Sequence, residues 1–192
     1  MAARGYCLIE VVFVASLSVV LAAIAIPQFL VSLDDHRAAG AARYVSTHCA
    51  RARIEAIRSG HDVAVRFTQD EDGVAYGVYE DRDGDGVRTS DIQRGVDTIM
   101  LRPERLSNTF PGVEFAVPAG LPPVDSGSPT DGDPLKLGAG NLLSYSSQGT
   151  SSSGSIYVRG RNGAQYVIRA YGETGKTRLL KFNATSRRWN PL

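Results

Sequence analysis

Three carboxylates at alternate positions, followed by glycine, could bind a metal ion. They lie in the run Asp81-Arg82-Asp83-Gly84-Asp85-Gly86. Acids at positions 1, 3 and 5 with glycine at position 6 begin a calcium loop, because the glycine lets the oxygen ligands converge. Such loops close with a Glu at position 12, but here that position is Ile92 and the nearest acid is Asp91. The run predicts either a calcium site or an acidic, solvated loop. The candidate ligands are Asp81, Asp83, Asp85 and Asp91.

A second group of side chains could contact the phosphates of a nucleic acid. It consists of the run Gly175-Lys176-Thr177-Arg178 and of Arg187 and Arg188, which precede Trp189. Basic residues near an exposed aromatic ring suit sequence-independent binding through phosphate contacts and base stacking. The alternative is that Gly175 makes a hairpin turn and the charges keep an edge strand soluble.

The histidines do not suggest catalysis. His36 and His48 are twelve residues apart on a predicted helix, too far to share a metal ion or a proton, and His61 follows the end of that helix. The sequence has no Gly-x-Ser-x-Gly nucleophile motif, no Cys-x-x-Cys pair and no phosphate-binding glycine loop. We therefore expect a protein that is not an enzyme and requires no cofactor, with calcium as the one candidate ligand.

The element that positions everything else is an apolar run at residues 11–33. At about 1.5 Å per residue, about twenty residues of helix cross the 30 Å core of a bilayer. Glu10 stands near the start of this segment, where an ionisable side chain is costly and needs a partner. A cut after Gly5 would keep the apolar segment and create an ammonium on Tyr6, about one helical turn from Glu10.

These N-terminal residues resemble the class III signal of type IV pilins and type II secretion pseudopilins. The resemblance rests on Gly5, Tyr6, the run Leu8-Ile9-Glu10 and the apolar helix, with Cys7 where the family usually has Thr. It implies that a membrane peptidase cleaves after Gly5 and methylates Tyr6, and that Glu10 aids assembly into a filament. Pro27 resembles the proline that kinks the helix of many pilins.

Two further runs resemble the GspH/FimT branch of minor pilins. Residues 52–60 are similar to the end of the long helix in that branch. Residues 175–178 are similar to a Gly-Arg-x-Arg motif that contacts DNA during uptake, with Lys176 replacing the first Arg. A phosphate contact survives this replacement, but a bidentate one does not.

The resemblance implies a minor pilin or pseudopilin with a structural or initiating role in a type II secretion pseudopilus or a type IV pilus. The chain would reside in a bacterial inner membrane as a single-pass protein with a periplasmic domain and then enter the filament. Its partners would be the prepilin peptidase and other pilins, contacted through the helix. The alternatives are a minor pilin that binds DNA for uptake and a signal-anchored, calcium-dependent adhesin.

The expected fold is an α+β lollipop, in which a long N-terminal helix packs on antiparallel β-structure. We expect a leader at residues 1–5, a membrane or filament-core helix at 6–33, its amphipathic second half at 34–60 and a β-rich domain at 61–192. The second half carries an apolar stripe at three- and four-residue spacing, and Gly60 is a good stop signal. The stripe contains Ala42, Val45, Cys49, Ala52 and Ala56, widened by Ile54 and Ile57.

Alternating apolar residues and turn signals predict the strands. They are expected at 62–68, 74–79, 98–102, 113–117, 142–145, 155–159, 165–171 and 177–182. Residues 69–73, 162–163 and 173–175 read as turns, and the Pro-, Gly- and Ser-rich residues 118–140 read as a long surface loop.

The overall composition indicates one globular domain with an uneven distribution of charge. The formal net charge is +1, which is no global signature of nucleic-acid binding. Residues 70–97 are nevertheless mainly acidic and residues 157–192 mainly basic, and each block could simply be a solvated face. Cys7 and Cys49 would lie far apart on one helix, so we expect no disulfide between them.

Overall fold

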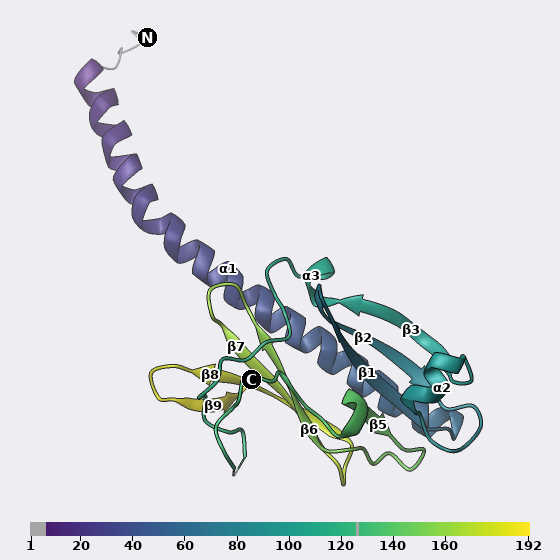
Figure 1. Ribbon diagram of the computed structural model, residues 1–192. Helices are drawn as coiled ribbons and strands as arrows, with labels where there is room; N and C mark the ends of the chain where they lie inside the picture. The colour runs from purple at the N-terminus through teal and green to yellow at the C-terminus, as the bar shows by residue number, and fades with distance from the viewer. Residues whose placement is uncertain (1–6, 126) are drawn as a thin grey trace.

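The computed structural model describes residues 7–125 and 127–192 (Figure 1). A single helix, α1 (Leu8–Ser59), extends well beyond the rest of the molecule (Figure 1). It ends at Gly60, which takes the left-handed conformation with φ 77° and donates its N–H to the carbonyl of Ala56 at 3.1 Å. The predicted helix and its stop signal are thus confirmed from Leu8 onward, while Gly5 and Tyr6 lie outside the described residues.

The second half of α1 packs into the domain through small residues. The predicted stripe of Ala42, Val45, Cys49, Ala52 and Ala56 is buried. The prediction that Ile54 and Ile57 widen this stripe is wrong, because they are 61% and 49% exposed. At 3.6 residues per turn, Ile54 lies two residues past Ala52 and Ile57 one residue past Ala56, so both side chains leave the buried face.

Two antiparallel sheets accompany the helix, in agreement with the expected α+β class. The first has the order β3-β2-β1-β5 and contains β1 (Val63–Asp70), β2 (Gly73–Glu80), β3 (Thr98–Arg105) and β5 (Leu142–Tyr145). The second has the order β4-β6-β7-β8-β9 and contains β4 (Leu135–Lys136), β6 (Gly154–Arg159), β7 (Gln165–Tyr171), β8 (Lys176–Asn183) and β9 (Arg188–Pro191). The short helices α2 (Thr89–Arg94), α3 (Leu106–Thr109) and η1 (Ala139–Asn141) lie in the connections.

Both sheets contribute to one core against the second half of α1. The predicted inward face of β1, formed by Val63, Val65 and Phe67, is buried in this core. On the other sheet, Tyr166 and Ile168 of β7 belong to the same cluster. The helix is therefore the common surface on which two separate sheets are assembled (Figure 1).

The outer face of each sheet is covered by a loop. Val87 and Ile92, from the acidic loop and α2, pack against Ala64 and Tyr79 of the first sheet. On the second sheet, Val117, Leu121 and Val124 pack over Tyr157, Val167 and Leu180. The segment predicted to be a long surface loop thus contributes apolar contacts and also contains the short strand β4.

Other sequence predictions need correction. Residues 113–117 form no strand; a bridge between Glu114 and Arg159 stands in its place. The tail, for which no strand was predicted, pairs with β8 as strand β9. The turn predicted at 69–73 is shorter, because Asp70 already pairs with Gly73. Cys7 and Cys49 are both free, as expected.

Candidate functional site

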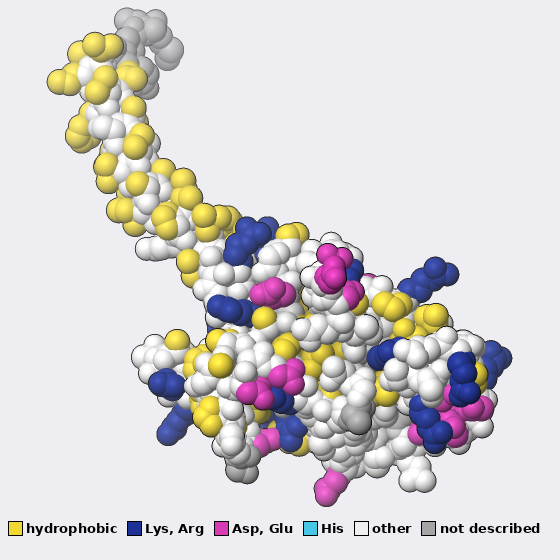
Figure 2. Space-filling model, viewed as in Figure 1, with side chains coloured by type: hydrophobic (Ala, Val, Ile, Leu, Met, Phe, Trp, Pro, Cys, Tyr) yellow, Lys and Arg dark blue, Asp and Glu magenta, His cyan; other side chains and the backbone are white. Residues whose placement is uncertain are grey.

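The first half of α1 has no partner within the described part of the molecule. None of its most apolar stretch of eighteen residues is buried. The exposed large side chains include Ile9, Phe13, Val19, Ile24 and Phe29, which point in different directions around the helix. Figure 2 shows hydrophobic side chains along the projecting segment almost to its base. By length and composition, this half of α1 could cross a membrane.

The few polar groups in this segment are largely satisfied locally. The hydroxyls of Ser16 and Ser18 donate to the carbonyls of Phe13 and Val14, each at 2.8 Å. Such bonds remove the need for an outside partner in an apolar medium. Pro27 stands within the helix, which remains continuous but bends in its projecting part (Figure 1). A proline removes one helical hydrogen bond, and this accounts for a bend near that position.

Glu10 lies in the first turn of α1 with an exposed side chain. Its backbone N–H donates to the carbonyl of Cys7 at 3.0 Å. Within residues 7–125 and 127–192, its carboxylate makes no hydrogen bond or ion pair. The amino end of a helix favours an acidic side chain through its dipole. The predicted partner, the amine of Tyr6, lies outside the described residues.

Two adjacent aspartates attach α1 to the second sheet just past the apolar run. Asp34 is buried, and its carboxylate accepts the backbone N–H groups of Arg161 and Asn162 at 2.9 and 2.8 Å. Asp35 accepts the Tyr166 hydroxyl at 2.8 Å and the Lys181 ammonium at 2.7 Å. We call these contacts of Asp34 and Asp35 the neck. They hold the helix where it leaves the domain.

The charge of Asp35 is stabilised despite its partial burial. Burial raises the pKa of Asp35, but the hydrogen bonds from Lys181 and Tyr166 outweigh that effect, so the pKa lies below its ordinary value. The pKa of Tyr166 is raised by burial and by the same carboxylate. The neck is therefore built for an ionised Asp35 at neutral pH.

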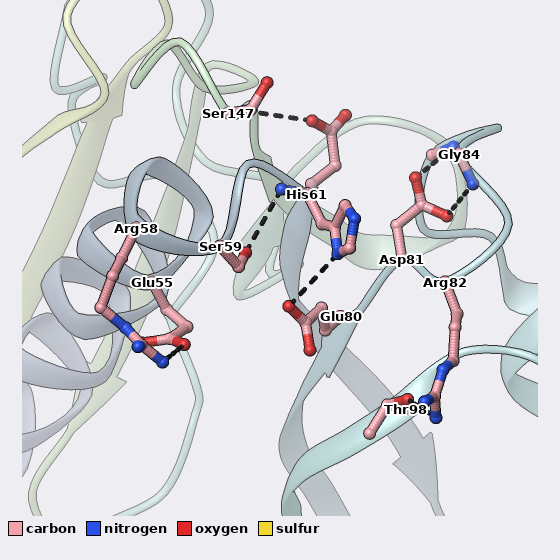
Figure 3. A network of polar contacts seen from close by, with 12 residues as sticks. Glu55, Arg58, Ser59, His61, Glu80, Asp81, Arg82, Gly84, Thr98 and Ser147 are labelled. Carbon is pink, nitrogen blue, oxygen red and sulfur yellow. Dashed lines mark hydrogen bonds and ion pairs between the residues drawn. The ribbon is translucent and has the colours of Figure 1, made fainter.

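The acidic loop folds back on its first aspartate. The carboxylate of Asp81 accepts the N–H groups of Gly84 and Gly86, each at 3.0 Å (Figure 3). Carboxylate oxygens of Asp81, Asp83 and Asp85 all lie within 4.8 Å of one another. Three of the four predicted ligands are thus brought together, as the spacing of the residues and the glycines requires.

The fourth predicted ligand, Asp91, does not belong to this group. Asp91 lies in α2, is 1% exposed and forms an ion pair with Arg94. Ile92 is turned toward the apolar cluster on the first sheet. The structure instead places Asp97 beside the loop, where its carboxylate accepts the N–H of Arg88 at 3.3 Å. Sequence reasoning missed Asp97, although its position just before a predicted strand was a usable signal.

The predicted DNA-contacting residues are distributed over both ends of β8. Lys176 and Arg178 are exposed near its start, whereas Arg187 and Arg188 are exposed beyond its end. Seven residues of strand separate these ends, which corresponds to about 23 Å. Trp189 is not freely exposed as expected, because its indole N–H donates to the carbonyl of Pro122 at 2.8 Å and its ring packs on Tyr157 and Phe182.

Gly175 has a structural role in the turn between β7 and β8. Its φ is +60°, and a Cβ atom there would lie 2.2 Å from the carbonyl oxygen of Gly149. Arg53 of α1 donates to the same carbonyl at 2.9 Å. The glycine of the predicted motif is therefore required by close packing against the helix.

Two histidines have separate surroundings. His61 lies just past α1 with its Nδ1 3.7 Å from a Glu80 oxygen (Figure 3). His48 packs edge-on against Tyr44, and burial lowers the pKa of His48.

No protein-family model, curated protein or solved structure matches the chain.

Proposed function

We propose that this protein is a minor pilin or pseudopilin, held in a bacterial inner membrane by its apolar half-helix before it enters a pilus or pseudopilus. The observation that carries the proposal is the contrast within α1: its second half packs against two sheets, and its first half is apolar all round and has no partner among the described residues. A helix of that kind is stable only in lipid or among other helices. A filament core built from such helices supplies the second environment.

The N-terminal residues support a specific form of assembly. Cleavage after Gly5 and methylation of Tyr6 would leave an ammonium close to Glu10, whose carboxylate has no partner among the described residues. In an apolar core, the carboxylate of one subunit would pair with the Tyr6 ammonium of a neighbour. Such a pair sets the register of the helices as much as the stability of the assembly.

The neck supports the same proposal. Asp34 and Asp35 follow the apolar run directly and tie α1 to the β6–β7 turn, to β7 and to β8. A subunit whose helix is embedded while its domain remains outside needs a firm connection at that boundary.

Intact-mass measurement of protein extracted from its native membrane tests the proposal. We expect a mass lacking residues 1–5 and carrying one methyl group on Tyr6. A chain that retains residues 1–5 in cells with an active prepilin peptidase would contradict the proposal, because Glu10 would then have no ammonium to meet.

Filaments sheared from cells that make a Glu10 variant test the role of Glu10. The change Glu10→Gln keeps the size of the side chain but removes its charge, so the protein should still be cleaved. Its amount in sheared filaments should fall by about tenfold or more, since a buried charge loses its partner. Glu71→Gln, an exposed acid of the β1–β2 turn, is the matched control and should assemble normally.

The two alternative functions stay predictions. A DNA-binding subunit would lose affinity steeply as the salt concentration rises, through loss of phosphate contacts. The separation of the basic groups and the internal packing of Trp189 do not favour this role. A signal-anchored adhesin would retain residues 1–5.

A further inference from the structure

Two buried aspartates are neighbours in the strand register where β2 and β3 meet the acidic loop. Glu80 of β2 pairs with Thr98 of β3, so the next residues outward, Asp81 and Asp97, are neighbours. Each is only 4% exposed. Two carboxylates so placed repel each other unless a proton or a cation lies between them.

Asp97 has an oxygen with no hydrogen-bond partner. Its Oδ2 accepts the N–H of Arg88 at 3.3 Å, whereas its Oδ1 is fully buried and has no donor among the described residues. Within the described ranges, the Asp81 carboxylate accepts hydrogen bonds only from backbone N–H groups, those of Gly84 and Gly86. A buried, unpaired carboxylate oxygen is costly, and a proton, a water molecule or a bound cation would each relieve that cost.

The backbone holds Asp97 in this position. The carbonyl of Asp91, at the start of α2, accepts the N–H of Val96 at 2.9 Å and that of Asp97 at 3.4 Å. Ile92 is partly buried against the first sheet and helps to hold α2 there. Ile92, which stands where a calcium loop has its Glu at position 12, therefore holds α2 on the sheet. Asp97, six residues after Asp91, brings an acid back to the loop.

Among the described residues, none of the three basic side chains near the loop pairs with Asp81, Asp83 or Asp97, although Arg88 pairs with the loop acid Asp85. Arg88 pairs with Asp85, Arg94 with Asp91, and Arg82 donates to the Thr98 hydroxyl at 3.2 Å. Asp81, Asp83 and Asp97 form no ion pair within the described ranges. Figure 2 shows acidic and basic side chains gathered over the end of the domain where α2 lies.

The surplus of negative charge at the loop acts on the pKa values of Asp97 and Asp83 in the same direction as burial. Burial and the charges of Asp81, Asp91 and Asp83 raise the pKa of Asp97, although the Arg88 N–H acts in the opposite direction. Desolvation and the neighbouring Asp85 raise the pKa of Asp83. Five acids of this region, Asp81, Asp83, Asp85, Asp91 and Asp97, outnumber its three bases, Arg82, Arg88 and Arg94, so the charges and the closeness of the loop carboxylates together favour a cation there.

We propose that Asp81, Asp83, Asp85 and Asp97 bind one calcium ion, with Asp97 closing the site from the start of β3. Hard divalent cations prefer oxygen ligands, and calcium accepts six to eight of them in flexible geometry. Each oxygen of Asp81 can keep its N–H bond and still offer a lone pair to the ion. Exposed Asp83 and Asp85 leave room for water ligands, whereas magnesium demands a smaller, nearly octahedral site. The ion would fasten the loop and α2 to the first sheet.

The test uses the full chain in a non-ionic detergent after removal of metals with a chelator. Calcium chloride is added during calorimetric titration and during thermal unfolding, with magnesium chloride in a parallel series. We expect one calcium per chain and a rise in Tm of several degrees, with magnesium much weaker. Asp97→Asn and Asp83→Asn should each weaken calcium binding by about tenfold or more, and Glu71→Gln should not.

A second readout separates a metal ligand from a merely structural residue. In chelator, Asp97→Asn should raise the Tm, because it removes the repulsion from Asp81, and calcium should then add little. A lower Tm for this variant with and without calcium, together with calcium binding equal to that of the unchanged chain, overturns the role of Asp97. Absence of binding heat at millimolar calcium, or unchanged binding by Asp83→Asn, overturns the site.

Discussion

Asp35 combines two kinds of partner, a hydroxyl and an ammonium, on one carboxylate that is only partly buried. The bonds from Tyr166 and Lys181 favour its ionised form. Because the pKa in the folded state lies below the ordinary value of about 3.9, the folded state is stabilised at pH values above that value. This contribution disappears as the pH falls through the folded-state pKa.

The variant Asp35→Asn tests that dependence. At pH 7 it should lower the free energy of unfolding by up to about 1 kcal/mol, since the partly exposed ion pair is screened by solvent. Near pH 3 the difference from the unchanged chain should shrink toward zero. Urea unfolding of both chains at the two pH values measures it. A difference of equal size at both pH values would show that Asp35 acts through packing alone.

The spacing of the acids and glycines in the sequence predicted some of the candidate ligands in the acidic loop but not all of them. Asp81, Asp83 and Asp85 lie close in the sequence, and Gly84 and Gly86 allow the loop to turn, so their convergence was predictable. Asp97 comes to the loop through the pairing of β2 with β3, which is a long-range feature. Asp91 was predicted as a ligand because it is an acid near position 12, but it lies in α2 and forms an ion pair with Arg94 there.

At the scale of elements, the helix was easier to predict than the strands around it. The three- and four-residue spacing of Ala42, Val45 and Cys49 identifies a buried stripe, because a helix repeats regardless of its partners. β9 was missed since four residues ending in Pro191 form a strand only when β8 offers its edge. The alternation at residues 113–117 was misleading, because Val113 and Phe115 are buried by packing without a ladder.

The turn between β6 and β7 meets α1 at an unusually close distance. A Cβ atom on Gly160 would lie 2.6 Å from Oδ2 of Asp34, the carboxylate that accepts the Arg161 and Asn162 N–H groups. The neck therefore depends on the absence of a side chain in the turn as well as on the aspartate.

The change Gly160→Ala should lower the free energy of unfolding by about 2 kcal/mol, because the methyl group displaces the buried carboxylate from its donors. Gly138→Ala is the matched control. No atom lies within 4 Å of the Cβ position at Gly138, so its effect should stay within about 0.5 kcal/mol. Denaturant unfolding compares the two. Equal effects would mean that the turn can move away from Asp34 at little cost.

At the scale of the whole molecule, the two halves of α1 have different surroundings: the second half packs in the core of the domain, and the first half projects from it. All of the helix residues in the central apolar cluster come from position 38 onward, and Asp34 and Asp35 are the neck contacts nearest to the projecting half. The most apolar part of the helix adds nothing to the buried interior. Folding of the domain and insertion of the helix should therefore be separable.

A chain beginning at Gln28 tests this separation. It keeps nearly two helical turns before the neck and removes most of the exposed apolar surface, so it should be soluble without detergent. Its Tm should match that of the full chain within about 2 °C, because no core contact is lost. A chain beginning at Arg37 is the control: it lacks Asp34 and Asp35, and it should melt several degrees lower because the Arg161 and Asn162 N–H groups and the Lys181 ammonium lose their acceptors. If both shortened chains melt alike and well below the full chain, the projecting half of α1 stabilises the domain directly. The hypothesis that this half is free to enter a filament core without affecting the domain would then be rejected.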